Sequence, residues 1–204
     1  MNAPVRWLGS SKGRSLELQN RQVRVVTAQG NFYGKRVILA LPPQIIAKIS
    51  LDTALSTLLH ERPHHFVLGK VIKNVVVYES AWWRSLGLSG AADTPSEPVE
   101  FLADTSQPEQ SGILVALASG SKAVKLSQMD EETRKATVLF HISKVLGTAP
   151  SPPTGFFSMD WINQQYSCGG YASRRAMRDW VNKKDALARP VGLIHFAGTE
   201  TAVE

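Results

Sequence analysis

The side chain best placed for chemistry is Lys73, which lies within the apolar run "KVIKNVVVY". If this run is a strand, period two places Lys73 on one face with Val71, Val75 and Val77. A positive charge on an apolar face is costly unless it is paired or hydrated. Lys73 is therefore the first residue to consider for a functional role. The alternative is an ammonium group that reaches the edge of the sheet.

Two glycine-containing stretches could contact a flat ligand. In "SCGGY", Gly169 and Gly170 allow close approach of the backbone, and Tyr171 adds an aromatic ring. A tyrosine packed within its own loop is the alternative. In "HFAGTET", a strand runs into the turn 198–200, which offers a hydroxyl, a carboxylate and backbone amides as the start of a helix does.

Other chemistries find little support in the sequence. The five histidines show no metal-ligand spacing with cysteine or carboxylates. Cys168 is the only cysteine, so an intrachain disulfide is impossible and a reducing compartment is favoured. The N-terminus lacks the apolar core of a signal peptide, and no apolar run approaches the roughly 18 residues of a membrane span. We therefore expect a cytoplasmic protein with no metal and no membrane contact.

The formal net charge of +6 could suggest a polyanionic partner. The basic residues are spread along the chain apart from a cluster between Arg174 and Arg189, which Asp179 and Asp185 interrupt. A solvated basic face is the favoured interpretation, because no zinc-finger spacing or RNA-binding motif is present. We expect no nucleic-acid partner.

Hydrophobic periodicity predicts the elements that must position the candidate residues. The predicted strands are 22–27, 36–41, 65–78, 96–104, 112–119, 155–161 and 191–198. The predicted helical segments are 44–49, 55–61, 81–87, 127–147 and 174–187. Strands and helices mix without a regular βαβ rhythm. This indicates an α+β fold with a mixed or antiparallel sheet flanked by helices.

Three of these segments carry further signals. The run 36–41 is almost continuously apolar, which is typical of a strand covered on both sides, and 112–119 is expected to be central. The segment 127–147 has acidic residues in its first turn, Lys144 in its last and Gly147 as a left-handed cap. Trp82 and Trp83 are expected to pack in a core.

Four stretches resemble the flavin-dependent amine oxidases in order and spacing: "VILALPP", "LGKVIKNVVVYESAWWR", "WINQQYSCGGYAS" and "IHFAGTET". The resemblance covers nearly the whole chain, from "NAPV" to "GTET". It implies an FAD-dependent oxidoreductase that takes a hydride equivalent from a small-molecule amine and leaves an imine. It also implies a partial FAD-binding segment at 1–42, a substrate-binding domain at 43–166 and a second FAD-binding segment at 167–204.

The resemblance implies a role for each candidate residue. Lys73 matches a lysine that holds a water near the flavin, and Tyr171 matches one wall of an aromatic cage that orients the amine. The positions that match flavin contacts in the family are Val5, Trp161, Gly169, Gly170, Gly198, Thr199 and Glu200. Gly170 stands where some members attach flavin covalently, so FAD is expected to be non-covalent.

Two features of the family are absent from this sequence of 204 residues. The sequence has no "GxGxxG", the motif that holds a dinucleotide pyrophosphate at a helix N-terminus, and no final helix after "GTET". We therefore expect an internal fragment that is inactive alone, and whether it binds FAD by itself stays open. The alternatives are a non-catalytic binding or assembly protein and one half of a split enzyme. Exposed apolar edges favour a homo-oligomer or a partner that supplies the missing FAD-domain pieces.

Overall fold

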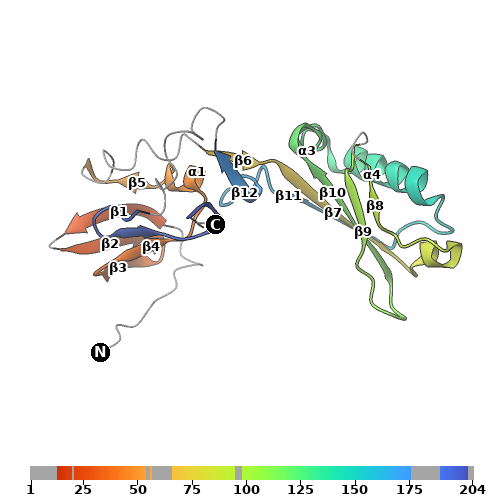
Figure 1. The fold of residues 1–204 in the computed structure, drawn as a ribbon, viewed down its shortest axis with the longest axis horizontal. Helices are drawn as coiled ribbons and strands as arrows, with labels where there is room; N and C mark the ends of the chain where they lie inside the picture. The colour runs from red at the N-terminus through yellow and green to blue at the C-terminus, as the bar shows by residue number, and fades with distance from the viewer. Residues whose placement is uncertain are drawn as a thin grey trace. The chain divides into compact units, whose positions relative to one another are not determined.

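The computed structural model describes residues 13–19, 21–53, 56, 66–94, 98–175 and 189–201. Contacts divide the chain into two units. We call Gly69–Tyr171 the central unit, and Met1–Leu68 together with Ala172–Glu204 the terminal unit. The fold is mixed α and β, with several sheets, mostly strands and few helices (Figure 1). The division into family domains at 42/43 and 166/167 stays a prediction.

An antiparallel sheet of five strands forms the central unit. In spatial order the strands are β11 (Gly155–Asp160), β7 (Val71–Tyr78), β10 (Gly112–Ser119), β9 (Phe101–Asp104) and β8 (Ala92–Asp93). β10 pairs with both β7 and β9, which confirms its predicted central position. The predicted strand 65–78 is divided at Lys70 into β6 (Phe66–Gly69) and β7.

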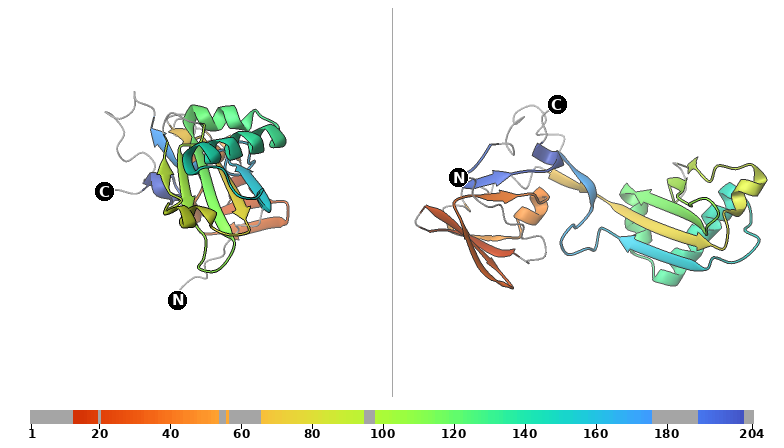
Figure 2. Two further views of the ribbon diagram at one scale, coloured as in Figure 1. Left: turned by 90° about the vertical axis from the view of Figure 1, so that its right-hand side faces the viewer. Right: turned by 90° about the horizontal axis from the view of Figure 1, so that it is seen from below.

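Two helices, α3 (Gly120–Ser127) and α4 (Glu131–Leu146), lie over one face of this sheet (Figures 1 and 2). Alternate residues of β7 turn towards them, so that Ile72, Asn74 and Val76 are fully buried. Val76 packs in one apolar cluster with Leu102 and Leu114 of the other strands and with Val138 and Ile142 of α4. Ile72 packs in a second cluster with Ala123 and Leu126 of α3. We call this the covered face of the sheet.

Tryptophans close one end of the covered face. The short 3₁₀ helix η2 (Trp82–Leu86) places Trp82 and Trp83 in the core, where 7% and 0% of their surfaces are exposed. Their rings pack edge to face with each other and with Tyr78. The predicted packing role of both tryptophans is therefore confirmed.

Helix α4 follows the signals in its sequence. The Asp130 carboxylate accepts hydrogen bonds from the backbone amide and the hydroxyl of Thr133, at 2.8 and 2.7 Å. Acidic residues occupy the first turn and Lys144 the last, as the macrodipole favours. Gly147 ends the helix at φ 90° and ψ 173°, so its conformation is not the predicted left-handed cap. Residues 127–129 belong to α3 and the connection, not to α4.

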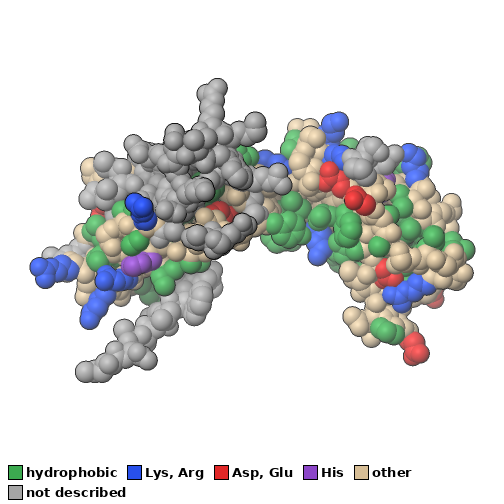
Figure 3. Space-filling model, viewed as in Figure 1, with side chains coloured by type: hydrophobic (Ala, Val, Ile, Leu, Met, Phe, Trp, Pro, Cys, Tyr) green, Lys and Arg blue, Asp and Glu red, His purple; other side chains and the backbone are tan. Residues whose placement is uncertain are grey.

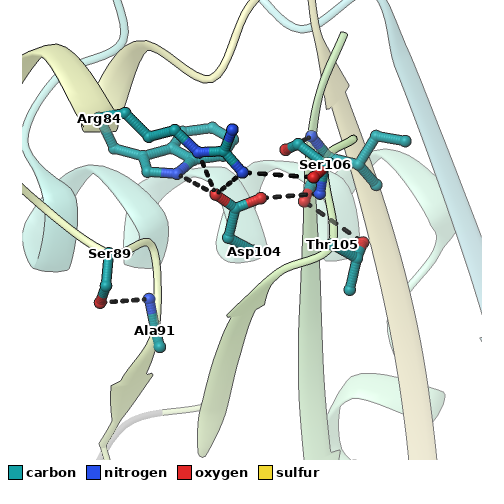
Figure 4. A network of polar contacts seen from close by, with 8 residues as sticks. Arg84, Ser89, Ala91, Asp104, Thr105 and Ser106 are labelled. Carbon is teal, nitrogen blue, oxygen red and sulfur yellow. Dashed lines mark hydrogen bonds and ion pairs between the residues drawn. The ribbon is translucent and has the colours of Figure 1, made fainter. Parts of the chain in front are cut away.

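A polar network centred on Asp104 ties η2 to the sheet (Figure 4). One carboxylate oxygen accepts from Trp83 Nε1 at 2.9 Å and from Arg84 Nε at 2.8 Å. The other accepts from the backbone amide of Ser106 at 2.8 Å. Burial raises the pKa of Asp104, but these hydrogen bonds outweigh burial and lower the pKa from 3.8 to about 2.

The terminal unit contains two sheets. One has the order β3 (Gly30–Gly34), β2 (Gln22–Thr27), β1 (Gly13–Gln19) and β5 (Ser50–Leu51), and the other pairs β13 (Ile194–Phe196) with β4 (Val37–Leu39) in parallel. Helix α1 (Pro43–Ile46) follows β4. The core is formed by residues from these elements, chiefly Leu16, Val23, Leu39, Ile46, Val191 and Ile194.

Two predictions for this unit need correction. The segment 36–41 is not covered on both sides among the described residues, because Ile38 exposes 62% of its surface while Leu39 exposes 6%. Arg174 and Arg175, predicted to begin a helix, belong to the strand β12 (Gly170–Arg175), which pairs with β6. The rest of that predicted helix and most of the segment 55–61 lie outside the described residues.

No helix in the described ranges is long and apolar enough to cross a membrane. No group of three or more histidine, cysteine or acidic side chains in those ranges could hold a metal ion. On the surface that Figure 3 shows, lysine and arginine side chains are scattered among apolar and polar ones. The predicted basic cluster is largely outside the described residues.

Candidate functional site

Lys73 lies on the face of the central sheet opposite to α3 and α4. Its neighbours in β7 along the chain, Ile72 and Asn74, are fully buried on the covered face, whereas Lys73 is half-buried. Across the sheet it is paired with Leu117 of β10 and Met159 of β11. The Lys73 ammonium makes no ion pair with any residue that the structure describes. A half-buried, unpaired ammonium between two apolar side chains is costly unless water or a ligand solvates it.

The surroundings of Lys73 form an apolar surface, which we call the open face. Val75 and Val77 of β7 share it, as do their partners Val115 and Ile113 of β10. Several large apolar side chains on this face are exposed: Phe101, Phe157 and Met159 at 45%, 64% and 42%. The strand-face grouping predicted for Lys73 is therefore confirmed, and the face is apolar and uncovered by the central unit's helices (Figure 2).

Trp161 is held by a polar turn immediately after β11. The Asp160 carboxylate accepts hydrogen bonds from the backbone amide of Ile162 at 3.0 Å and from Asn163 Nδ2 at 2.8 Å. It also accepts from the Ser127 hydroxyl of α3, at 2.6 Å. An aspartate that bonds the amide two residues ahead forms an Asx turn. Trp161, half-buried, is thus fixed between two anchored neighbours.

The loop before Tyr171 carries backbone strain. Cys168 and Tyr171 have φ of 53° and 47°, in the left-handed region that residues other than glycine rarely adopt. The Tyr171 side chain is 75% exposed, so it is not the packed loop tyrosine of the alternative interpretation. Such conformations persist only where the surroundings impose them, and they gather at ligand-contacting loops.

The sequence suggested that a ligand approaches Gly170 closely, whereas in the structure a side chain of the protein itself does so. A Cβ at Gly170 would lie 2.8 Å from Cβ and Cγ2 of Val71. Its missing side chain therefore lets β12 pack closely on β7, two residues from Lys73. Gly169 is buried beside it. These contacts bring the glycine loop and the Lys73 end of β7 together within the central unit.

The predicted turn at 198–200 lies in the terminal unit. Gly198 has φ 129° and leads into a single 3₁₀ turn, Thr199–Thr201. The Glu200 carboxylate accepts a hydrogen bond from the Ser173 backbone amide at 3.0 Å, and the Ser173 hydroxyl contacts Gln44 Oε1 at 3.2 Å. Glu200 therefore fastens the turn to β12, and its carboxylate has a structural partner.

The structure thus gathers Lys73, Gly170 and Tyr171 around one end of β7, and Gly198 to Glu200 in the other unit. Val5 lies outside the described residues. Sequence reasoning did not identify Asp160 or Ser173 as supports. For Asp160 a local signal was present, because an aspartate at the end of a strand commonly bonds the backbone amide two residues ahead and starts an Asx turn. For Ser173 there was none, because its partner Glu200 is 27 residues away.

Comparison with protein families and curated proteins gives consistent matches. The family model for flavin containing amine oxidoreductases matches residues 2–204 of the chain. An L-amino acid dehydrogenase of Synechocystis sp. is 30% identical over 90% of this chain and 39% of its own length. The flavin-containing amine oxidase B of Bos taurus is 31% identical over 92% of this chain and 37% of its own.

Solved structures agree with the sequence matches. A putrescine oxidase bound to putrescine superposes with a TM-score of 0.83 at 31% identity, covering 94% of this chain and 43% of that chain. The cyclohexylamine oxidase of Brevibacterium oxydans gives a TM-score of 0.83 at 26% identity, covering 93% and 42%. The chain spans about two fifths of the length of the relatives it matches.

Proposed function

The chain belongs to the flavin-containing amine oxidoreductase family, and from this premise we propose that it forms the substrate-binding part of an FAD-dependent oxidoreductase acting on a small amine. A putrescine oxidase among the similar structures binds putrescine, which supports a small amine as the ligand class. The product of such a reaction is an imine.

The observation that carries the proposal is the unpaired Lys73 on the open face. An apolar sheet surface with one half-buried ammonium suits a flat ring system with a polar edge, and FAD carries such a ring. When bound, FAD supplies the acceptor for the hydride equivalent that leaves the amine. Lys73 donates hydrogen bonds and holds a water at that edge, because the described residues leave its ammonium without a counter-ion.

Tyr171 and Trp161 take the positioning roles. The exposed Tyr171 ring is held by a strained backbone, so it can form one wall beside the amine and orient it through its ring face and hydroxyl. Trp161, anchored through Asp160, lies two residues beyond Met159, the cross-strand partner of Lys73. Gly169 and Gly170 bring the tyrosine loop close to β7. Gly198, Thr199 and Glu200 belong to the terminal unit, and their proposed flavin contact rests on the family match alone.

Two experiments test this function. In the first, FAD is added to the purified chain and the excess is removed by gel filtration. The visible spectrum then reports whether the chain retains FAD. We expect little retained flavin, because no glycine-rich dinucleotide motif occurs in these residues.

The second experiment grafts this chain into the matching part of the Kocuria rosea putrescine oxidase, of which it covers 42%. We expect the chimera to hold FAD without a covalent bond and to oxidise an amine. Lys73→Met should slow turnover roughly tenfold or more, as loss of a charged hydrogen bond does. Lys125→Met, on the exposed side of α3, is the matched control. A chimera that binds FAD but oxidises no amine, or equal rates for both variants, would refute the proposal.

A second candidate, an assembly protein or one half of a split enzyme, is favoured by the open face itself. Exposed Phe101, Phe157 and Met159 form the kind of apolar surface that partners cover. Size-exclusion chromatography with light scattering should then give a mass above that of one chain, or a mass that rises when an FAD-domain polypeptide is added. A monomer that binds no such partner contradicts this candidate.

A further inference from the structure

A buried asparagine lies on the covered face of the sheet, next to Lys73 in the chain. Asn74 of β7 has no exposed surface, and it lies between aliphatic neighbours on that face. Its partners across the sheet are Ser158 of β11 and Ala116 of β10. A buried amide is unfavourable unless its oxygen and nitrogen are both hydrogen-bonded. The environment of this side chain therefore depends on what the two neighbouring strands present to it.

The hydrogen bonds around Asn74 run in one direction. Arg134 of α4 donates from Nη1 to the Ser158 hydroxyl at 3.2 Å, and that hydroxyl donates to Asn74 Oδ1 at 2.8 Å. Asn74 Nδ2 donates onward to the Ala116 carbonyl at 3.4 Å. A guanidinium can only donate and a backbone carbonyl can only accept, so the serine hydroxyl has to donate to the amide oxygen. The two ends of this row of bonds thus fix the orientation of the Asn74 amide.

The donor end of the row is itself anchored. Arg134 Nε donates to the carbonyl of Leu126 in α3 at 2.9 Å, and Nη2 donates to the carbonyl of Met129 in the connection to α4 at 3.0 Å. One guanidinium therefore joins α3, α4 and β11. It presents the Ser158 hydroxyl with a donor whose place is set by two helices.

The register between β7 and β11 gains from such a polar restraint. A slip by one residue would turn every side chain to the other face, which the apolar alternation excludes. A slip by two residues keeps the faces, and β7 consists mostly of valine and isoleucine, so apolar packing distinguishes these registers weakly. After such a slip, Asn74 would lie opposite Phe156 or Asp160 instead of Ser158. Phe156 has no hydrogen-bonding side chain, and the Asp160 carboxylate is engaged in its own turn.

This register also sets the spacing of two candidate site residues. Lys73 belongs to β7 and lies opposite Met159 of β11, and Trp161 follows two residues after Met159. Because Lys73 and Trp161 are attached to different strands, their separation changes when one strand slides along the other. A slip by two residues would change it by about 7 Å, the rise of two residues in a strand.

We propose that Asn74 is a positioning residue. Through the Ser158 hydroxyl it fixes the register of β7 and β11, and the register places Lys73 relative to Trp161. The consequence for turnover rests on the proposed function, whereas the register does not.

Cross-strand contacts between backbone protons, measured by nuclear magnetic resonance on the full chain, test the register. The wild type should give one set of contacts, with Val75 opposite Phe157. Asn74→Leu keeps the size of the side chain and removes the amide, and Ser158→Ala removes the hydroxyl that bonds it. Each should add a second set, in which Val75 lies opposite Gly155 or Met159.

Two control variants separate the polar restraint from stability. Val76→Ala creates a cavity on the same buried face but leaves the row of hydrogen bonds intact, so it should keep one set of contacts. Ser158→Thr retains the hydroxyl and should also keep one set. Ser158 is half-buried, so Ser158→Ala decides the question if Asn74→Leu does not fold. A single set of contacts in Ser158→Ala, or a second set in Val76→Ala, would overturn the proposal.

The putrescine oxidase chimera tests the consequence for turnover. Asn74→Leu should lower kcat about tenfold, because a misplaced group slows the reaction even when substrate still binds, and KM should stay within about twofold. In the Lys73→Met background the same substitution should change kcat by less than about twofold, since Asn74 acts through Lys73. An equal fall of kcat in both backgrounds would mean a general structural effect and would overturn the positioning role.

The two measurements distinguish this inference from the proposed function. If the chimera oxidises no amine, or Lys73→Met leaves turnover unchanged, the proposed function fails and the register contacts decide the role of Asn74. If Lys73→Met slows turnover and Asn74→Leu does not, the proposed function stands and the positioning role fails.

Discussion

Replacing Asp104 by asparagine removes a charge from the network that holds η2 against the sheet (Figure 4). Asparagine keeps the shape of the side chain, but its amide group cannot accept from Trp83, Arg84 and Ser106 together. The side chain of Asp104 is 8% exposed, so the lost interactions are not replaced by water. We therefore expect Asp104→Asn to destabilise the central unit.

The magnitude follows from the lowered pKa. A fall in pKa from 3.8 to about 2 corresponds to about 2 kcal/mol of stabilisation at neutral pH, since a change of one in pKa is worth about 1.4 kcal/mol. Arg84 is 47% exposed, so solvent screens its part of the interaction. The expected loss in Asp104→Asn is therefore about 1–2 kcal/mol in the free energy of unfolding.

The same network predicts a dependence on pH. The folded-state pKa of Asp104 lies below its unfolded value. At acidic pH the folded state therefore binds fewer protons than the unfolded state, and protonation favours unfolding. The stabilisation is complete above about pH 4 and is lost as the pH falls towards about 2. Glu100 and Asp130 also have lowered pKa values, the first chiefly through the Ser119 hydroxyl and the second through the Thr133 amide. The difference between wild type and Asp104→Asn isolates the contribution of Asp104.

Urea unfolding, followed by tryptophan fluorescence between pH 7 and pH 2.5, measures both effects. Asp93→Asn is the matched control, because Asp93 is exposed on the neighbouring strand β8. Asp104→Asn should be less stable than the control at pH 7, and the two should converge at low pH. Equal stability at pH 7, or a difference that persists unchanged at pH 2.5, would refute the reasoning.

Three further substitutions test the packing and capping of the central unit by the same unfolding measurement. Gly90→Ala would place Cβ 2.5 Å from Trp83 Nε1 at φ 73°, and we expect a loss of about 1–3 kcal/mol; a neutral result would show that this contact relaxes freely. Gly170→Ala brings a methyl group against the branched side chain of Val71 and should also lower the free energy of unfolding by about 1–3 kcal/mol. Unchanged stability would contradict this expectation. Asp130→Ala removes the N-cap of α4 and should lower the free energy of unfolding by about 1 kcal/mol. An unchanged free energy would show that the cap does not stabilise α4.

Sequence patterns predicted the elements of the central unit well, because burial there follows local periodicity. The strands 71–78 and 112–119 and the helix after Asp130 have strong apolar alternation or an apolar stripe, and their caps are encoded nearby. Helix α3 was not predicted as a separate element. It has eight residues and no side-chain cap, so its stability comes from packing on β7 and β10.

The candidate site was predictable only in part. Lys73 stands out by its residue type in an apolar strand, and Tyr171 by the glycines before it. The supports of this site come from distant segments: Ser127 reaches Asp160 across 33 residues, and Glu200 reaches Ser173 across 27. No local pattern contains such pairs, because each partner is ordinary in its own sequence context.

The sequence by itself determined the alternation that puts Lys73 on one face of β7 and the tryptophans in the core, and it carried the four motifs of the amine oxidoreductase family. Only the tertiary structure decided which face the helices cover, and therefore that Lys73 lies on the open one. It also decided that Gly170 makes room for Val71, and that Ile38 is exposed among the described residues. The physical reason is that periodicity fixes the side of an element on which a residue lies, whereas what covers that side depends on packing between segments far apart in the chain.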